Sequence, residues 1–258
     1  MIAIGRRVYG LGAVVLGAAG LAYGAFAPVW LPVPAHLPGY PVLAYAAAAL
    51  LVLAGLAINA PRVAGPAALA LAALFGGSML ATYAPYMLAK PGNWGVWQGV
   101  AESTAMALGG VLAWAMAPGA GERAAVARIA RLAFGLCLLV FGASHFVYLK
   151  LTASMVPVWL PPSQVFWAGA TGVAQIAAGL AMLSGVQARL AAILLTGMYL
   201  AFGVLVHIPS VLADAHSQDN WAENGINLVL AGAAWSLADW LSKPRRPAPE
   251  GSASAPAG

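Results

Sequence analysis

Two histidines, His145 and His207, are the residues whose type and position first indicate chemistry. Each lies in a long apolar run, His145 17 residues after Arg128 and His207 18 residues after Arg189. At about 1.5 Å of rise per helical residue, the two imidazoles lie at a similar depth in their helices. Imidazole ligates haem iron or copper and hydrogen-bonds a quinone carbonyl. The pair therefore indicates a ligand-binding site, and the alternative is two interfacial histidines hydrogen-bonded to neighbouring carbonyls.

Two glutamates are the acidic candidates for the same site. Glu102 lies inside an apolar run, where a buried carboxylate requires a partner or a proton. Glu223 is expected near the start of the last helix, where the helix N-terminus alone would stabilise it. We predict that one or both contact the ligand or transfer protons.

Other candidates come from the aromatic residues and the outer loops. Trp159 belongs to a rigid proline-rich segment that would form a lid, or else an aromatic belt at the membrane interface. The further expected ligand contacts are Tyr83 and Trp221. His216 stands between Asp214 and Asp219, so the metal-ligand candidates are His145, His207 and His216. No residue is assigned a catalytic role.

The composition defines the setting in which these residues act. Of 258 residues, 62% are hydrophobic and 7% are charged, against roughly 25% charged residues in soluble domains. Such a chain is not a soluble enzyme or a disordered protein. Its net charge is +5, and the basic residues are scattered along the chain rather than clustered, so nucleic acid is not an expected partner. The single cysteine excludes an internal disulfide and a cysteine-ligated cluster.

The apolar runs predict an all-α polytopic membrane protein with eight transmembrane helices. The expected spans are 8–27, 41–60, 64–86, 97–117, 126–148, 166–185, 188–208 and 222–241. If these spans alternate, ten basic residues fall on one side: Arg6, Arg7, Arg62, Arg123, Arg128, Arg131, Arg189, Lys243, Arg245 and Arg246. Lys90 and Lys150 fall on the other. The positive-inside rule then places both termini in the cytoplasm.

An ordered series of matches indicates an internal duplication. The pentapeptide PVWLP occurs at 28–32 and again at 157–161, and AGLA occurs at 54–57 and 178–181. Glu102 then aligns with Glu223, and Tyr83 with His207; Tyr23 aligns approximately with His145. Because four spans are an even number, the halves form two parallel four-helix repeats related by an axis along the membrane normal. The predicted units are repeats 1–117 and 124–242, a cytoplasmic linker 118–123 and a disordered tail 243–258.

The second half resembles a known family in the order of its motifs. A helix ending in FGASHF (141–146) is followed by PVWLPP (157–162), a glycine-rich helix with QIAAGL (175–180), and then HIP (207–209) and WAEN (221–224). This order is similar to the DoxX-like family of small four-helix membrane proteins, related to DoxD and to the Surf4-type superfamily. The resemblance implies a membrane redox setting linked to quinones. This chain differs from most members in being a fused pair, and no catalytic motif carries over.

The sequence thus favours an inner-membrane protein with a redox-linked role that binds a quinone or haem b near the periplasmic side. Its expected partners are the lipid bilayer and membrane or periplasmic redox subunits. Two alternatives come from other classes: a non-catalytic carrier of small solutes, and a structural subunit of a larger membrane complex. No nucleotide-binding or serine-hydrolase motif is present.

Overall fold

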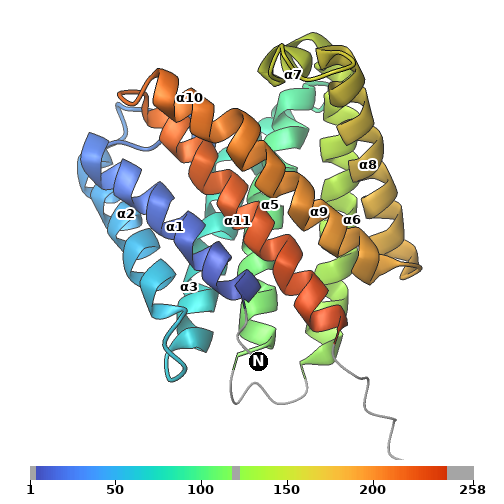
Figure 1. The fold of residues 1–258 in the computed structure, drawn as a ribbon. Helices are drawn as coiled ribbons and strands as arrows, with labels where there is room; N and C mark the ends of the chain where they lie inside the picture. The colour runs from blue at the N-terminus through green and yellow to red at the C-terminus, as the bar shows by residue number, and fades with distance from the viewer. Residues whose placement is uncertain (1–3, 118–122, 243–258) are drawn as a thin grey trace, which may run out of the picture.

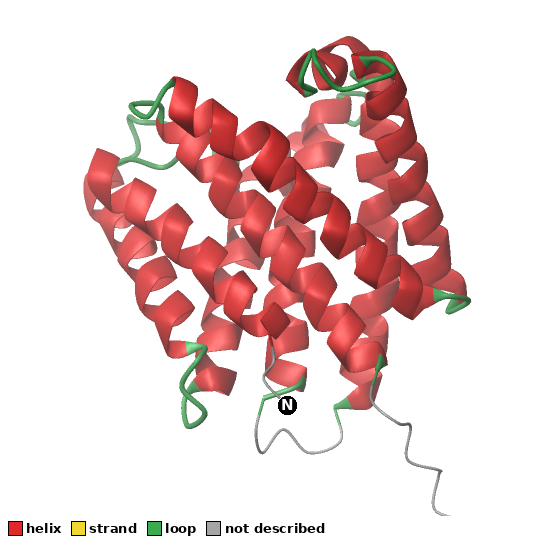
Figure 2. Ribbon diagram, viewed as in Figure 1, coloured by secondary structure: helices red, strands yellow, loops and turns green. Residues whose placement is uncertain are grey.

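The structure, a computed structural model, describes residues 4–117 and 123–242. Within these ranges every regular element is a helix, and the long helices run between two opposite ends of the molecule (Figures 1 and 2). The elements are α1 (Ile4–Tyr23), α2 (Tyr40–Ala57), α3 (Ala64–Ser78), η1 (Met79–Tyr83), α4 (Ala84–Ala89), α5 (Trp94–Ala115), α6 (Ala124–Val147), α7 (Leu149–Met155), α8 (Gln164–Ser184), α9 (Ala188–Phe202), η2 (Gly203–His207), α10 (Ile208–Ala213) and α11 (Gln218–Leu241). The predicted tail 243–258, with Lys243, Arg245 and Arg246, and linker positions 118–122 lie outside the described residues.

Six helical stretches are long and apolar enough to cross a membrane. They are Ile4–Tyr23, Tyr40–Ala57, Ala64–Ala89, Ala124–Val147, Gln164–Ser184 and Ala188–Ala213. The other two predicted spans form α5 and α11, which are of similar length but carry glutamate together with amide or hydroxyl residues. The short helix α7 was not expected from the sequence.

One end of the molecule is basic. The helices α1 and α6 begin there, α5 and α11 end there, and the turns from α2 to α3 and from α8 to α9 lie there (Figure 1). We call this end the basic face; its cations are Arg6, Arg7, Arg62, Arg123, Arg128, Arg131 and Arg189. The opposite face carries α4, α7 and α10, with Lys90 and Lys150.

Helices of the two halves pack against each other as well as within each half. In the first half α1 packs on α2 and α3 packs on α5; in the second, α6 packs on α8 and α9 packs on α11. However, α1 packs far more closely against α11 than against α5, and α6 packs against α5. The halves are therefore interlocked rather than two separate bundles, and α5 and α11 meet at the centre.

Glycines set the closest helix contacts. A Cβ atom at Gly10 would lie 2.5 Å from the Gly55 carbonyl oxygen, and one at Gly135 would lie 3.0 Å from that of Gly179. Between α1 and α11, a Cβ at Gly232 would lie 2.2 Å from the Tyr9 nitrogen. Small residues permit this approach where lipid gives no hydrophobic drive for helix association.

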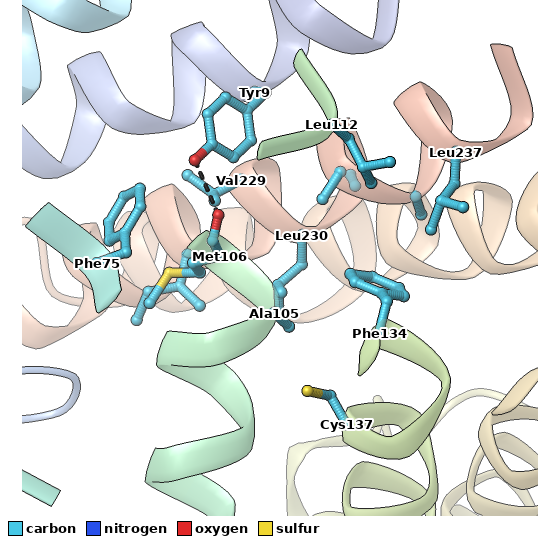
Figure 3. Close-up of a cluster of buried hydrophobic side chains, with 14 of the residues drawn as sticks. Tyr9, Phe75, Ala105, Met106, Leu112, Phe134, Cys137, Val229, Leu230 and Leu237 are labelled. Atoms are coloured by element: carbon cyan, nitrogen blue, oxygen red, sulfur yellow. Dashed lines mark hydrogen bonds between the residues drawn. The ribbon is translucent and has the colours of Figure 1, made fainter. Parts of the chain in front are cut away.

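The buried core draws on both halves of the chain (Figure 3). Tyr9 is fully buried, and its hydroxyl donates to the Met106 carbonyl at 2.8 Å. Phe75 meets the Tyr9 ring edge-on at 6.4 Å, and Trp30 meets Phe75 at 5.8 Å. Three aromatic rings thus fill the space between α1, α3 and the loop after α1.

The local geometry of the two halves matches at a fixed spacing. The π-helical segments η1 and η2 begin at Met79 and Gly203, and the N-cap residues of α5 and α11 are Asn93 and Ser217. Both pairs are 124 positions apart. The contacts of Gly10 and Gly135 place α1 and α6 125 positions apart.

This spacing differs from part of the pairing expected from the sequence. At this spacing Tyr83 corresponds to His207, whereas Glu102 corresponds to Ile226 and Glu223 to Gly99. Position 145 pairs with Gly20 rather than Tyr23. The two registers differ because the loops between the matched motifs have different lengths, whereas the helix caps and close helix contacts recur at one spacing.

Candidate functional site

A cavity of about 620 Å³ lies between α5, α6, α8, α9, η2 and α11 on the side opposite the basic face. Residues of α7 and of the loop 156–160 line its outer end. Most lining side chains are apolar. The polar ones are Gln98, Glu102, Ser144, His145, Thr152, Thr171, Gln175, Tyr199, His207, Glu223 and Asn227. The two histidines and two glutamates selected from the sequence therefore line one cavity.

His145 projects from α6 and is oriented by α8. Its Nδ1 atom lies 3.0 Å from the Ala168 carbonyl oxygen and 3.1 Å from Oγ1 of Thr171. Because a carbonyl only accepts, Nδ1 carries the hydrogen. In the neutral ring Nε2 then holds a lone pair, and the ring stacks on Phe202 with centroids 6.5 Å apart. The carbonyl bond expected of a structural histidine is present, and it leaves Nε2 able to accept a hydrogen bond or bind a metal.

Close packing fixes the position of this ring. A Cβ atom at Gly172 would lie 2.8 Å from the His145 Cβ, so α8 passes directly against the base of the side chain. In the first half Gly20 occupies the corresponding position and faces Ala48. The histidine and the glycine that accommodates it therefore occur together only in the second half.

His207 and Glu223 form a pair across η2 and α11. The His207 Nδ1 atom lies 3.8 Å from Oε2 of Glu223, which is ion-pair range but too long for a hydrogen bond. Accordingly, Nδ1 of His207 is buried without a hydrogen-bond partner. Glu223 lies in the second turn of α11, because the helix begins at Gln218. The helix N-terminus therefore does not account for this carboxylate.

Glu102 enters the cavity from α5, a helix of the first half. Its carboxylate is close enough to that of Glu223 for the two to repel each other when both are charged. No lysine or arginine lines the cavity. The site is thus acidic, and charge on both carboxylates is costly unless a proton or a cation enters.

Gln175 and Tyr199 supply buried polar atoms without partners. Each side chain is 3% exposed, and neither Oε1 of Gln175 nor the Tyr199 hydroxyl has a hydrogen-bond partner among the described residues. Gln175 lies near the middle of α8, so the cavity reaches deep between the helices. Buried polar groups normally have partners, and these two are therefore available to a ligand.

The π-helical segment η2 directly follows α9 and changes the helix geometry beside the cavity. Nδ2 of Asn227 on α11 donates to the Tyr199 carbonyl at 2.9 Å. A Cβ atom at Gly203 would lie 3.0 Å from that nitrogen, so the glycine makes room for the bond. Single π turns are frequent at functional sites, and this one positions Tyr199 and His207.

A hydrogen-bond chain joins the halves next to His145. Nε1 of Trp94 donates to Oγ of Ser144 at 2.7 Å, and that hydroxyl donates to Oε1 of Gln98 at 2.6 Å. Ser144 precedes His145 on α6, while Trp94 and Gln98 lie on α5. The chain thus positions α6 relative to the helix that carries Glu102.

Four of the sequence candidates do not line the cavity. Tyr83 lies against α5 at Gly99. Trp159 is 68% exposed, and Trp221 donates its indole N–H to the Ala215 carbonyl at the surface. Asp214 accepts from the main-chain N–H of His216, and the described residues contain no cluster of three potential metal ligands.

Among the polar residues of the cavity that sequence reasoning missed are Gln98, Gln175, Tyr199 and Asn227. All lie inside apolar runs, which was the available signal. Amide and phenol side chains are common enough in membrane helices that position alone did not separate them from packing residues.

One family model matches part of the chain. A domain of unknown function, DUF8561, matches residues 134–238. This stretch contains His145, Gln175, Tyr199, His207 and Glu223, but not the α5 residues Gln98 and Glu102. No curated protein and no solved structure matches the chain.

Proposed function

We propose that the chain is an integral membrane protein with eight spans in two parallel repeats, both termini cytoplasmic, in the bacterial inner membrane. The polar helices α5 and α11 lie at the centre, where neighbouring helices cover their polar residues. The concentration of arginines on the basic face supports the orientation. The 124-residue spacing of η1 and η2 supports the repeat.

Within this protein, we propose that the cavity binds a quinone-type ligand. The observation that carries the proposal is the pair of buried, unpartnered groups on Gln175 and Tyr199 inside a mostly apolar cavity. A quinone has an apolar ring and carbonyl oxygens that accept hydrogen bonds. The Tyr199 hydroxyl supplies a donor to one of them.

The titratable residues suit the protons that accompany quinone chemistry. His145 has its Nδ1 hydrogen held by Ala168 and a free Nε2, so it accepts a hydrogen bond from a ligand hydroxyl. His207 and Glu223 form a partly buried pair, with Glu102 nearby. We assign this group to proton transfer.

Haem b is the other ligand that two histidines indicate. Its iron could be ligated through Nε2 of His145, but its propionates are anionic. The lining contains two carboxylates and no lysine or arginine, so it suits an uncharged ring better. An oxidised-minus-reduced optical spectrum tests this choice, because a Soret band that shifts with dithionite would favour haem.

The redox-linked role rests on the resemblance of the second half to DoxX-like proteins. In this proposal a partner subunit supplies the electrons. The position of the cavity opposite the basic face supports a partner on the periplasmic side.

Quenching of tryptophan fluorescence by ubiquinone-1 tests the proposal, since Trp167 lines the cavity. Tyr199→Phe should weaken binding of ubiquinone-1, and His145→Gln that of its reduced form ubiquinol-1, each about tenfold, corresponding to one lost hydrogen bond in a buried site. Tyr83→Phe and His216→Gln are matched controls outside the cavity and should leave binding unchanged. Equal affinities for all five proteins would refute the site.

A carrier for lipophilic cations is the second candidate. It is favoured by two carboxylates that lack a lysine or arginine partner, together with the aromatic rings of Phe141, Tyr148 and Trp167. Quenching or displacement by tetraphenylphosphonium that is lost in Glu102→Gln, with ubiquinone-1 binding absent, would favour this function.

A further inference from the structure

A second hollow lies on the basic face, far from the cavity. It is a groove of about 380 Å³ between α1 and α2, lined by Arg7, Leu11, Val14, Gly55, Leu56 and Asn59. The two helices touch at Gly10 and Gly55. The groove therefore has an apolar wall along the helices and a polar end at the basic face.

The corresponding surface of the second half is entirely apolar. The positions that match Arg7 and Asn59 are Leu132 and Leu183, at the spacings of 125 and 124 set by the helix contacts. The apolar positions match Leu136, Leu139 and Leu180. Helix packing is thus compatible with leucine at every lining position other than the glycine, and the polar pair is a specific feature of the first half.

The polar end of the groove is cationic. Arg7 is exposed, and no acidic residue lines the groove. Arg6 is its neighbour on α1, and Arg62 lies in the turn after α2. Asn59 adds an amide, which bonds only weakly to the Gly55 carbonyl at 3.4 Å. A guanidinium and an amide at the end of an apolar groove match a phosphate diester that carries acyl chains.

We propose that this groove binds an anionic phospholipid. Arg7 and Asn59 would hold the phosphate, and Leu11, Val14 and Leu56 would contact the first part of an acyl chain. The site is independent of the proposed quinone function, since it shares no residue with the cavity.

Native mass spectrometry of the purified chain with equal amounts of dioleoyl phosphatidylglycerol and dioleoyl phosphatidylcholine tests the proposal. The wild type should bind phosphatidylglycerol preferentially. Arg7→Leu/Asn59→Leu, which copies the second half, should reduce that preference about fivefold, corresponding to one arginine contact of about 1 kcal/mol. Arg189→Leu removes a charge from the same face outside the groove and should have no such effect.

The reverse substitutions in the second half provide a gain-of-binding test, whose result cannot be explained by unfolding of the variant. Leu132→Arg/Leu183→Asn should raise the number of tightly bound phosphatidylglycerol molecules by one. An unchanged preference in the Arg7→Leu/Asn59→Leu protein, or an equal loss in Arg189→Leu, would overturn the proposal. Displacement of the lipid by inorganic phosphate would also overturn it, because the site would then recognise the free ion.

Discussion

The pentapeptide PVWLP meets opposite environments in its two copies. Trp30, in the first copy, is 4% exposed and packs on Phe75, whereas Trp159, in the second, is 68% exposed. The position that corresponds to Phe75 is Tyr199, whose hydroxyl faces the cavity without a partner. The tryptophan of the same five residues is thus buried in the first half and exposed in the second, because the side chains around it differ.

A second pair of corresponding positions also differs between the two halves. In the first half the Tyr83 ring lies over Gly99 of α5; in the second, His207 faces Glu223 of α11 at the corresponding positions. The Tyr83 ring fills the space over Gly99, whereas His207 and Glu223, whose nearest side-chain atoms are 3.8 Å apart, line the cavity.

The largest expected effect separates the two tryptophans. Trp30→Ala should lower the free energy of unfolding by about 3–5 kcal/mol, since it opens a cavity beside Phe75. Trp159→Ala removes a side chain with few contacts and should change it by less than about 0.5 kcal/mol. Thermal unfolding in mild detergent measures both. Similar losses would show that the second loop also packs inside.

The next largest effect concerns the two interfaces between the halves, α1 with α11 and α5 with α6. Gly232→Ala places a Cβ against the Tyr9 backbone and should cost about 1–3 kcal/mol. The corresponding position on α5 is Leu108, a partly buried residue with a large side chain in place of the glycine. Gly197→Ala is the control, because its Cβ meets open space, and it should stabilise by up to about 1 kcal/mol. A destabilised control would show that the glycine contacts are not the cause.

The third test converts the open half toward the closed one. His207→Tyr/Glu223→Gly copies the pair found at Tyr83 and Gly99. Its ring should occupy part of the cavity and weaken ubiquinone-1 binding at least tenfold, a change of about 1.4 kcal/mol. The melting temperature should stay near that of the wild type, because the same arrangement is accommodated in the first half. Undiminished binding would contradict the comparison.

Much of the helix pattern could be predicted from the sequence, because apolar length alone determines where a chain can span a bilayer. Each of the eight expected segments overlaps a long helix or a continuous run of helices. The first helix ends at Tyr23 rather than at residue 27, since Gly24 has φ of +62° and ends it. The π-helical segments gave no sequence signal, because they depend on contacts such as that between Gly203 and Asn227.

The site was predictable only in part. Ionisable residues in apolar runs are conspicuous, so both histidines and both glutamates were selected and now share a cavity. Trp159 and Trp221 were chosen for their aromatic type, yet their orientation depends on loop packing. Glu102 lines a cavity that lies mostly in the other half, because α5 packs on α6. The packing of α5 on α6 and of α1 on α11 cannot be deduced from a sequence repeat, because the repeat is the same whether the two halves pack against each other or form separate bundles.

The smallest effect concerns the helix distortion shared by both halves. Ser78 donates to the Phe75 carbonyl at 2.7 Å within one helix, whereas Asn227 donates to the corresponding Tyr199 carbonyl from another helix. Asn227→Ala should therefore cost about 0.6 kcal/mol, the average for an interhelical hydrogen bond in a membrane protein. Ser78→Ala should cost less, because its bond connects no second helix. Hydrogen exchange of η2 provides the finer measurement: it should rise in Asn227→Ala, while exchange of η1 stays unchanged in Ser78→Ala. If hydrogen exchange of η2 in Asn227→Ala stays as unchanged as that of η1 in Ser78→Ala, the π turn maintains its own geometry. The difference between the halves then lies only in the side chains around it.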